Sequence, residues 1–398
     1  MRRRAFQLQE FLHCWPHSQE LVYLGTHTPW KSGGSEPGSA QEACTSRLGP
    51  SSSTISARSF SGHAPTHYGF FLRGSAYDDR CLRWPRNAPR TRVMDRASRF
   101  AVVGAGIAGL ACARRLHEAG LETDVFDKGR APGGRICTKV EDDRSWDHGA
   151  QFIRARGAAF REQLAAWERA EVLGPWENLE GSHLGLPSMR ALGVAMTRGL
   201  NVMSSTTVTK VEPGDGGYTL WGRGHGENMR KLGWYERVVM AVPAQQAVAL
   251  VRELAEPLAA VKPLPCWALL LTYEAKVDLP AVLRGEEAFG FVQCESRKPG
   301  RDESTERWVV HMSAEWSQRH LELSQEEALA AALPCLPTEL QTPSAMRAHR
   351  WRYASLESWV GESFVEVGGV SACGDGLLGP RVELAWESGD ALGRHLRE

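Results

Sequence analysis

The stretch that decides the fold is FAVVGAGIAGLACARRLHEAGLETDVFDKGRAPGGR, residues 100–135. FAVV predicts a short buried strand, and IAGLACARRLHEAG predicts a helix that ends at Gly120. Gly104, Gly106 and Gly109 match the pattern G-x-G-x-x-G/A. In this pattern the first glycine permits a tight turn, the second lets a pyrophosphate approach the backbone, and the third lets the helix pack on the strand. The run therefore predicts a dinucleotide site, with the phosphates at the positive end of the helix.

The next predicted strand, ETDVFDK, ends in an acidic residue. Asp127 lies about 20 residues after the glycine turn, the separation at which a carboxylate hydrogen-bonds a ribose hydroxyl. Strand, turn, helix, strand and acid thus follow one another in the order of a Rossmann-type unit. The cofactor-binding residues predicted from this unit are Gly104, Ala105, Gly106, Ile107, Ala108, Gly109, Asp127 and Lys128.

Two glycine-containing segments that follow indicate which dinucleotide binds. GRAPGGRICT contains Gly134 and Arg135, and WDHGAQF contains Gly149, Ala150 and Gln151. They resemble segments of the amine-oxidase-like flavoproteins, in which the arginine faces the pyrophosphate of FAD and the small residues lie against the flavin ring. An NAD-dependent dehydrogenase needs no such arginine loop; a surface turn with a solvated arginine is the simpler alternative. The resemblance implies that the cofactor is FAD.

The C-terminal run CGDGLLGPRVELAWESG completes the predicted FAD site. It predicts a strand that ends at Gly374 and Asp375 and a helix that begins at about Val382. In the same superfamily the aspartate binds the ribityl chain, and the amides at the helix start stabilise negative charge on the flavin. VTKVEPGDGGYTL looks like a strand pair that covers the adenine through the backbone near Val211. The cofactor-binding residues predicted outside the first unit are Gly134, Arg135, Gly149, Ala150, Gln151, Val211, Gly374, Asp375, Arg381, Val382 and Glu383.

Segments of the substrate domain narrow the resemblance. DHGAQFIRAR, VKPLPCWALLLTYE, ESRKPGRDESTERWVVHMSAEWSQRHLE and AHRWRYA, together with the FAD segments, resemble the renalases, especially their bacterial forms, from about residue 99 to the end. The resemblance implies a non-covalently held FAD that oxidises the 2- and 6-dihydro isomers of NAD(P)H to NAD(P)+ and reduces O2 to hydrogen peroxide. It implies catalytic positions at Gln151, on the reacting side of the flavin, and at His311. A structural histidine on a buried strand is the alternative for His311.

Three departures from the family pattern leave other functions open. Phe152 and Ile153 stand where a tyrosine and another aromatic residue are common, and Glu295 replaces an asparagine near the presumed pocket mouth. PWENLEGSHLGLPSMRALGVAM is shorter than its counterpart, which predicts an unpaired strand edge and exposed apolar surface. One alternative is an amine or polyamine oxidase on the same fold, although no segment of the sequence indicates an aromatic cage or a lysine-bound water. The other is a non-catalytic FAD-binding protein.

The resemblance implies an α/β fold class: a doubly wound FAD-binding domain of the glutathione-reductase/p-hydroxybenzoate-hydroxylase type with an antiparallel-sheet substrate domain. Residues 1–93 show no sustained hydrophobic period and are rich in Ser, Gly, Pro, His and Arg. They predict a disordered leader, which is either a targeting peptide or the product of a start upstream of Met94. The predicted FAD-binding parts are residues 99–160, 201–250 and 361–398, and the predicted substrate-domain parts are residues 161–200 and 251–360.

Composition argues against several classes of protein. The 47 Lys and Arg residues balance 47 Asp and Glu residues, so no overall charge attracts nucleic acid or an anionic membrane. No run approaches the roughly 18 apolar residues of a membrane span. The nine cysteines are scattered without a C-x-x-C pair, which predicts neither a disulfide framework nor a metal site. The expected partners are a small dihydronicotinamide and O2, in the cytoplasm or in an organelle if the leader is a targeting peptide.

Overall fold

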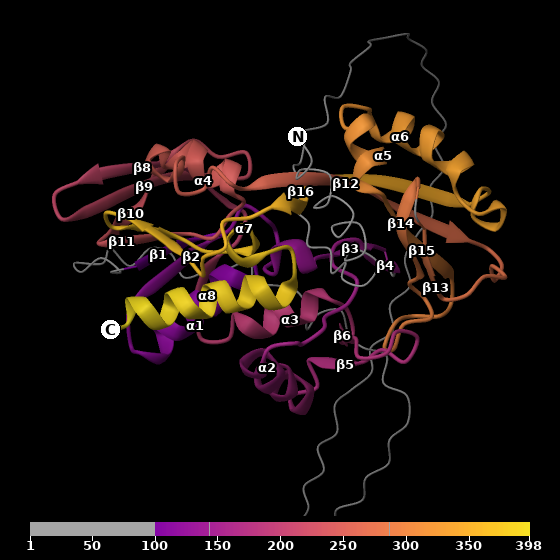
Figure 1. Ribbon diagram of the computed structural model, residues 1–398, viewed down its shortest axis with the longest axis horizontal. Coiled ribbons are helices and arrows are strands. Elements are labelled where there is room, and N and C mark those ends of the chain that lie inside the picture. The colour runs from indigo at the N-terminus through magenta and orange to yellow at the C-terminus, as the bar shows by residue number, and fades with distance from the viewer. Residues whose placement is uncertain (1–99, 143, 286) are drawn as a thin grey trace, which may run out of the picture. The chain divides into compact units, whose positions relative to one another are not determined.

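The computed structural model describes residues 100–142, 144–285 and 287–398 (Figure 1). The predicted leader, residues 1–93, lies outside the described residues. Within them, the two largest sheets are a six-stranded, mainly parallel sheet and a five-stranded antiparallel sheet.

The parallel sheet is built around β1 (Phe100–Val103), whose four residues are all buried. Phe100 and Val102 belong to the core on one face of the sheet, and Ala101 and Val103 belong to the core on the other. An uninterrupted apolar run is therefore required, because both faces of this strand are covered. The strand order is β17-β18-β11-β1-β2-β7, with only the β17-β18 pair antiparallel. The other strands are β2 (Thr123–Phe126), β7 (Asn201–Met203), β11 (Arg237–Met240), β17 (Val365–Val367) and β18 (Val370–Ala372).

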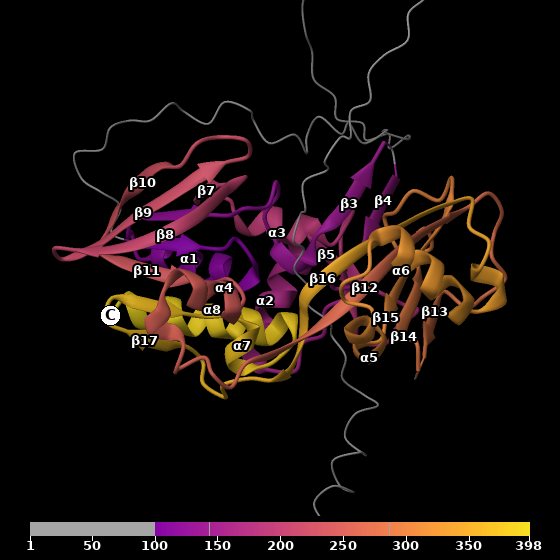
Figure 2. The ribbon, with the colours of Figure 1, turned by 90° about the horizontal axis from the view of Figure 1, so that it is seen from above.

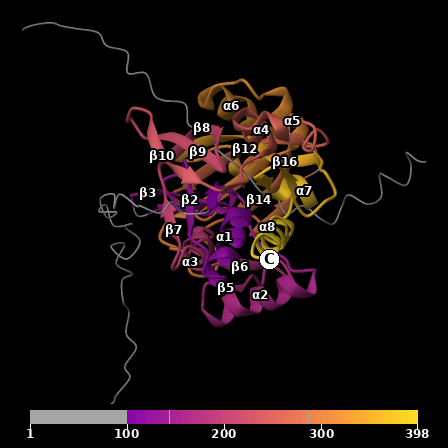
Figure 3. The ribbon, with the colours of Figure 1, turned by 90° about the vertical axis from the view of Figure 1, so that its left-hand side faces the viewer.

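Two helices pack side by side on one face of this sheet. Figure 3 shows α1 (Ile107–Glu118) beside α8 (Val382–Leu396). A Cβ atom at Gly389 would lie 2.0 Å from the carbonyl oxygen of Ala108. Glycine is thus needed where the two helix backbones meet, and α8 begins at Val382 as predicted.

A small antiparallel sheet covers the opposite face of the parallel sheet. Val208, Val211 and Leu220 of this small sheet pack in one core with Ala101 and Val103. The expected strand pair after the first unit is therefore confirmed, and it contributes to the core as a layer of its own. This layer comprises β8 (Thr206–Gly214), β9 (Gly217–Gly224) and β10 (Arg230–Tyr235), with α4 (Ala244–Leu250) beside it.

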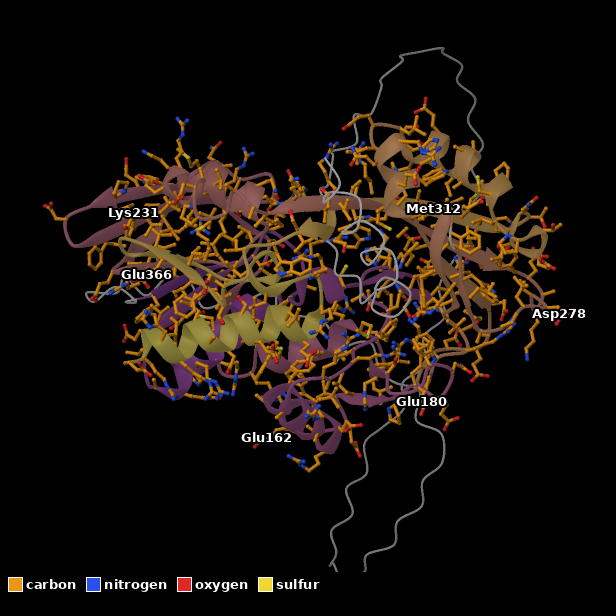
Figure 4. All side chains as sticks on the ribbon, viewed as in Figure 1. Glu162, Glu180, Lys231, Asp278, Met312 and Glu366 are labelled. Atoms are coloured by element: carbon orange, nitrogen blue, oxygen red, sulfur yellow. The ribbon has the colours of Figure 1, made fainter. Side chains whose placement is uncertain are left out.

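The five-stranded antiparallel sheet has two faces with different neighbours. On β15 (Glu306–Met312), Trp308, Val310 and Met312 pack in the core beneath α5 and α6, as Figure 4 shows for the labelled Met312. The alternating residue Val309 packs with Trp146 on the other face. Figure 2 shows β12 and β16 paired along much of their length. The remaining elements of this part are β12 (Lys262–Tyr273), β13 (Val282–Arg284), β14 (Phe289–Cys294), β16 (Ala345–Ser358), α5 (Ala314–Arg319) and α6 (Gln325–Ala332).

The segment that was expected to leave an unpaired strand edge forms a hairpin, and the expected exposed apolar surface is wrong. β5 (Leu173–Pro175) pairs with β6 (His183–Gly185), and His183 also exchanges backbone hydrogen bonds of 2.8 and 2.9 Å with Ile153. Trp176 and Leu184 are buried. The hairpin and the bridge to Ile153 thus give β6 a partner on both sides. The elements around it are β3 (Thr138–Glu141), β4 (Arg144–Asp147), α2 (Ala158–Arg169), α3 (Arg190–Met196) and α7 (Asp375–Leu378).

We predict that Gly389→Ala lowers the free energy of unfolding by about 1–3 kcal/mol, because the added methyl group collides with the backbone of α1. Gly214→Ala is the control, since no described atom lies within 4 Å of a Cβ atom there, and its change should stay within about 0.5 kcal/mol. Urea denaturation followed by tryptophan fluorescence measures both. Equal stability of the two variants would contradict the close packing of α1 and α8.

Candidate functional site

The three glycines of the turn have different structural roles. Gly104 has φ +111°, and a Cβ atom on it would lie 2.4 Å from the carbonyl oxygen of Ala241. A Cβ atom on Gly109 would lie 2.0 Å from the carbonyl oxygen of Gly104, so this glycine lets the helix contact the strand. At Gly106 no described atom lies within 4 Å of the added Cβ atom. The second glycine therefore borders open space at the start of α1, as a pyrophosphate site requires.

The start of α1 presents backbone amides rather than a side-chain cap. Gly106 is the N-cap residue, and it provides no capping side chain. Ile107 and Ala108 follow in the first turn and are buried. The N–H groups of a first helical turn have no partner within the helix, so this end is suited to an anion.

Asp127 lies at the end of β2, as predicted, but its carboxylate also binds the protein backbone. Its two oxygens accept hydrogen bonds from the N–H groups of Ala105 and Gly129, both at 2.6 Å. Burial raises the pKa of Asp127, and these two donors oppose the rise. Each carboxylate oxygen can accept more than one hydrogen bond, so a ribose hydroxyl can still be accommodated. Lys128 donates to Gln246 of α4 at 3.1 Å.

Three of the predicted loops meet through their backbones. The N–H group of Gly133 donates to the carbonyl oxygen of Ala105 at 2.8 Å, and a Cβ atom on Gly134 would lie 3.1 Å from the Cα atom of Gly106. A Cβ atom on Gly149 would lie 2.1 Å from the carbonyl oxygen of Arg135. That same carbonyl oxygen accepts the N–H of Ala150 at 2.9 Å. The structure thus brings residues 104–109, 133–135 and 149–150 together.

Arg135 and Asp375 were predicted as separate cofactor contacts, and the structure joins them in an ion pair. The guanidinium donates to Oδ2 of Asp375 at 2.7 Å and makes a second contact with Oδ1. Gly374, with φ +145°, precedes the aspartate, and no described atom lies within 4 Å of a Cβ atom built on it. Ser388 of α8, which the sequence reasoning missed, accepts the N–H of Gly374 at 2.9 Å and so holds this turn.

The start of α8 combines a predicted role with an unpredicted one. Arg381 is the N-cap residue and supplies no capping side chain; its guanidinium lies 3.0 Å from Oε2 of Glu383. Oε1 of Glu383 accepts the N–H groups of Arg156 and Gly157, both at 2.6 Å, at the start of α2. The side chain of Glu383 therefore links two helices. The predicted role at the flavin therefore stays with the backbone amides at the start of α8.

Gln151 and His311, from segments 160 residues apart, meet in the interior. Nε2 of Gln151 donates to the carbonyl oxygens of Gly149, at 2.8 Å, and of Asp147. Both amide hydrogens are then used, so Nε2 of His311 is best assigned as the donor to the carbonyl oxygen of His148 at 3.3 Å, with Nδ1 as the acceptor atom of the ring. Burial lowers the pKa of His311 to about 3. The imidazole is neutral at pH 7.

Four fully buried ionised side chains, Asp147, Glu295, Lys298 and Arg301, lie next to this pair and are here called the buried quartet. Lys298 Nζ lies 2.9 Å from Glu295 and 3.4 Å from Asp147. Arg301 lies 3.2 Å from Glu295 and 2.5 Å from Asp147. Burial raises the pKa of Asp147, but the charges of Arg301 and Lys298 outweigh burial and hold it well below its usual range.

The buried quartet corrects one sequence expectation and adds residues that the sequence analysis missed. Glu295 is fully buried rather than at an open pocket mouth, because two cations neutralise it. Asp147, for which the sequence analysis predicted no role, forms ion pairs with both cations. The run ESRKPGRDESTER gave a weak signal, since a charged turn between two strands is usually solvated. Lys298 and Arg301 are buried because each pairs with acidic side chains, Glu295 and Asp147.

Aromatic side chains border the Gln151 and His311 pair. Phe152 contacts Phe291 and Trp176, with ring centroids 5.8 and 6.2 Å apart. Trp351 stacks on His148 and donates its N–H to that residue's carbonyl oxygen at 2.9 Å, while Trp316 packs in the core beneath α5. Trp351 therefore lies near the predicted site, and Trp316 does not.

The residues present fit a dinucleotide. The space at Gly106 and Gly374 is open, and the nearby helix starts lack side-chain caps. Together with the half-buried Arg135 between the two turns, they match the donor set that a pyrophosphate needs. Among the described residues, no group of three or more His, Cys, Asp and Glu side chains is placed to hold a metal ion. No described helix is long and apolar enough to cross a membrane. A cavity of about 530 Å³ is lined by Asp278 and its neighbours and by none of the predicted site residues.

Comparison with known proteins agrees with this reading of the fold. Residues 102–166 match the NAD(P)-binding Rossmann-like domain family. A stretch of 56 residues, 14% of this chain, is 45% identical to the zeta-carotene-forming phytoene desaturase of Myxococcus xanthus and spans 11% of that protein.

Solved structures extend the similarity to most of the chain. A putrescine oxidase variant superposes with a TM-score of 0.57 and 14% identity, over 75% of this chain and 98% of the other. Cyclohexylamine oxidase from Brevibacterium oxydans gives a TM-score of 0.56 and 12% identity, over 76% and 99%. The predicted fold class is confirmed: a Rossmann-like domain with a parallel sheet, joined to an antiparallel-sheet domain, as in the amine oxidases. The comparisons support this fold rather than renalase specifically.

We predict that His311 makes the protein less stable as the pH falls. Its pKa is about 3 in the folded state and about 6.5 when unfolded, so between these values the unfolded chain binds a proton that the folded chain does not. His311→Asn should reduce the slope of unfolding free energy against pH by up to about 1.4 kcal/mol per pH unit between about pH 6 and pH 4. The exposed His225→Asn is the control. An unchanged slope in His311→Asn would show that this imidazole titrates normally.

Proposed function

We propose that the protein is an FAD-dependent oxidase of small organic substrates. The main support is the open space at Gly106 and Gly374, at two separate turns that border the Arg135–Asp375 ion pair. A pyrophosphate at the first turn and a ribityl chain at the second would place the arginine beside the phosphates. The similarity of fold to putrescine oxidase and cyclohexylamine oxidase agrees with this proposal.

In this proposal each group of predicted residues takes a part of the cofactor. The first turn of α1 would hold the pyrophosphate, Asp127 the ribose, and the backbone of Val211 the adenine edge. The amides at Val382 would face the electron-rich edge of the ring. Bound FAD would supply the redox chemistry, accepting a hydride from substrate and passing the electrons to O2 as hydrogen peroxide.

The side chains at the proposed reacting face position the substrate and exclude water. They do not transfer protons. His311 is neutral and Gln151 does not titrate, so neither provides an acid with a pKa near 7. Both are buried, as are the neighbouring rings of Phe152, Phe291 and Trp176. A face of this kind keeps water away and orients a substrate that brings its own hydride.

An amine is our first candidate substrate. Putrescine oxidase and cyclohexylamine oxidase share the fold, and the apolar rings beside Gln151 suit the carbon skeleton of an uncharged amine. In this reading the substrate would bind deprotonated, because Arg154 and Arg284 lie over these rings and would repel an ammonium group.

A dihydronicotinamide, as in the renalases, is the second candidate, and one observation favours it. Arg154 lies over the ring of Phe152 at 5.3 Å, and Arg284 lies over the ring of Phe291 at 5.4 Å. Burial and the charge of Arg154 lower the pKa of Arg284, which indicates that the two cations are near each other. Arg154 also donates to the carbonyl oxygen of Glu180 at 3.0 Å. Two cations beside the aromatic rings suit an anionic substrate such as a dinucleotide.

We predict that Gly106→Ala folds normally but binds FAD at least about tenfold more weakly. The added methyl group meets no described atom within 4 Å, yet it occupies the space proposed for the pyrophosphate. Gly214→Ala is the control for both properties. FAD affinity is measured by flavin fluorescence, and stability is measured by urea denaturation. We expect FAD to be held non-covalently, so acid precipitation should release the flavin from the wild-type protein. Unaltered affinity in Gly106→Ala would place the cofactor elsewhere.

We predict that anaerobic mixing of the FAD-loaded protein with the right substrate bleaches the flavin, and that O2 restores its colour with about one peroxide per turnover. Stopped-flow absorbance with putrescine, cyclohexylamine, and 2-, 4- and 6-dihydro-NAD(P) separates the two candidates. Bleaching by amines alone supports the first candidate, and bleaching by the 2- or 6-dihydro isomers supports the second. Bleaching by none would favour a non-catalytic FAD-binding protein.

A further inference from the structure

The buried quartet lies where four separate parts of the chain meet. Asp147 ends β4, and Glu295, Lys298 and Arg301 belong to the turn between β14 and β15. Arg301 also donates to the carbonyl oxygen of Gly185 in β6 at 3.0 Å. Asp147 accepts the N–H of Met189, just before α3, at 3.1 Å. Movement of any of these parts would therefore disturb the others at this point.

We propose that Lys298 is a positioning residue that fixes the amide of Gln151, with Glu295 as the counter-charge that keeps the surrounding quartet neutral. The proposal rests on the proposed FAD-binding function, because it places Gln151 at the reacting side of the flavin. No function was predicted for Lys298 or Glu295 from the sequence. Lys298 itself is not assigned any contact with substrate or cofactor.

Hydrogen-bond chemistry allows only one orientation of this amide. Lys298 Nζ, which can only donate, lies 3.1 Å from Oε1 of Gln151. On the other side, the carbonyl oxygens of Gly149 and Asp147 can only accept, and they contact Nε2. A flipped amide would face the ammonium group with N–H donors and the two carbonyls with an oxygen. Lys298 therefore fixes which atom of Gln151 points in each direction.

Charge balance explains why Glu295 is needed. Lys298 and Arg301 carry two positive charges, and Asp147 alone would leave one of them uncompensated in the interior. Glu295 supplies the second negative charge and contacts both cations, at 2.9 and 3.2 Å. Removing one member of a buried ion pair is strongly destabilising, because its partner stays buried and charged. The quartet as a whole carries no net charge beside the proposed flavin face.

The test compares Lys298→Met, Glu295→Gln and the double variant in the full chain, with and without FAD. Each single change should raise the unfolding equilibrium constant about a hundredfold or more, and the double change should cost less than the sum of the two. Lys210→Met is the matched control, since Lys210 pairs with Glu212 at the surface, and it should change this constant by no more than about fivefold.

The reduction potential of the bound flavin and the rate of its reduction together distinguish a positioning role of Lys298 from a purely structural one. Glu295→Gln leaves a net positive charge beside the proposed flavin face and should raise the potential, whereas Lys298→Met leaves a net negative charge and should lower it. Lys298→Met should also add no further loss to the rate of flavin reduction in a Gln151→Ala background, because both changes act through the same amide. If Lys298→Met does not fold, the isosteric Glu295→Gln carries the test.

The outcomes distinguish this inference from the function on which it rests. Potential shifts of opposite sign, with non-additive rates, support the positioning role. A flavin-loaded Glu295→Gln protein with the wild-type potential overturns it. A wild-type protein that binds no FAD overturns the proposed function itself, and the stability comparison then still reports whether the four charges are coupled.

Discussion

The candidate site depends on backbone contacts at positions where a side chain would collide. A Cβ atom on Gly109 would strike the carbonyl of Gly104, and one on Gly149 would strike the carbonyl of Arg135. These contacts hold the start of α1, the arginine loop and the loop after β4 within van der Waals distance of one another. A collision at either point would separate loops that together border the space at Gly106. The proposed cofactor site would then be disrupted even though all of its hydrogen-bond donors remained in the sequence.

The β3–β4 hairpin and the five-stranded sheet are joined by buried charges, whose desolvation is costly. Asp147 at the end of β4 and the cations of the β14–β15 turn are buried, and their desolvation must be offset by mutual pairing and by hydrogen bonds to backbone groups. Apolar residues would fill the same volume without that cost. Apolar residues, however, would not orient the amide of Gln151, which requires a donor on one side and acceptors on the other.

Neutrality and aromatic surface characterise the proposed reacting face. His311 is held neutral by burial, and the nearby rings are packed against one another. Such a face is suited to a cofactor that performs the redox step, with the protein determining position and access. Arg154 and Arg284, which lie over the rings of Phe152 and Phe291, add positive charge beside this face. This charge would favour an anionic substrate over a cationic one.

The Rossmann-type unit, the helix that begins at Val382 and the strand pair around Val211 could be predicted from the sequence, and the resemblance to known flavoproteins supplied the fold class. The predicted elements depend on local periodicity and on glycines whose spacing along the chain is short and regular. Three features became apparent only in the folded chain: Arg135 pairs with Asp375, Glu383 links two helices, and Glu295 and Lys298 are buried together. The reason is physical: a charged side chain on a turn is exposed or buried according to whether an opposite charge meets it, and those partners lie up to 240 residues away. No local pattern records such a meeting.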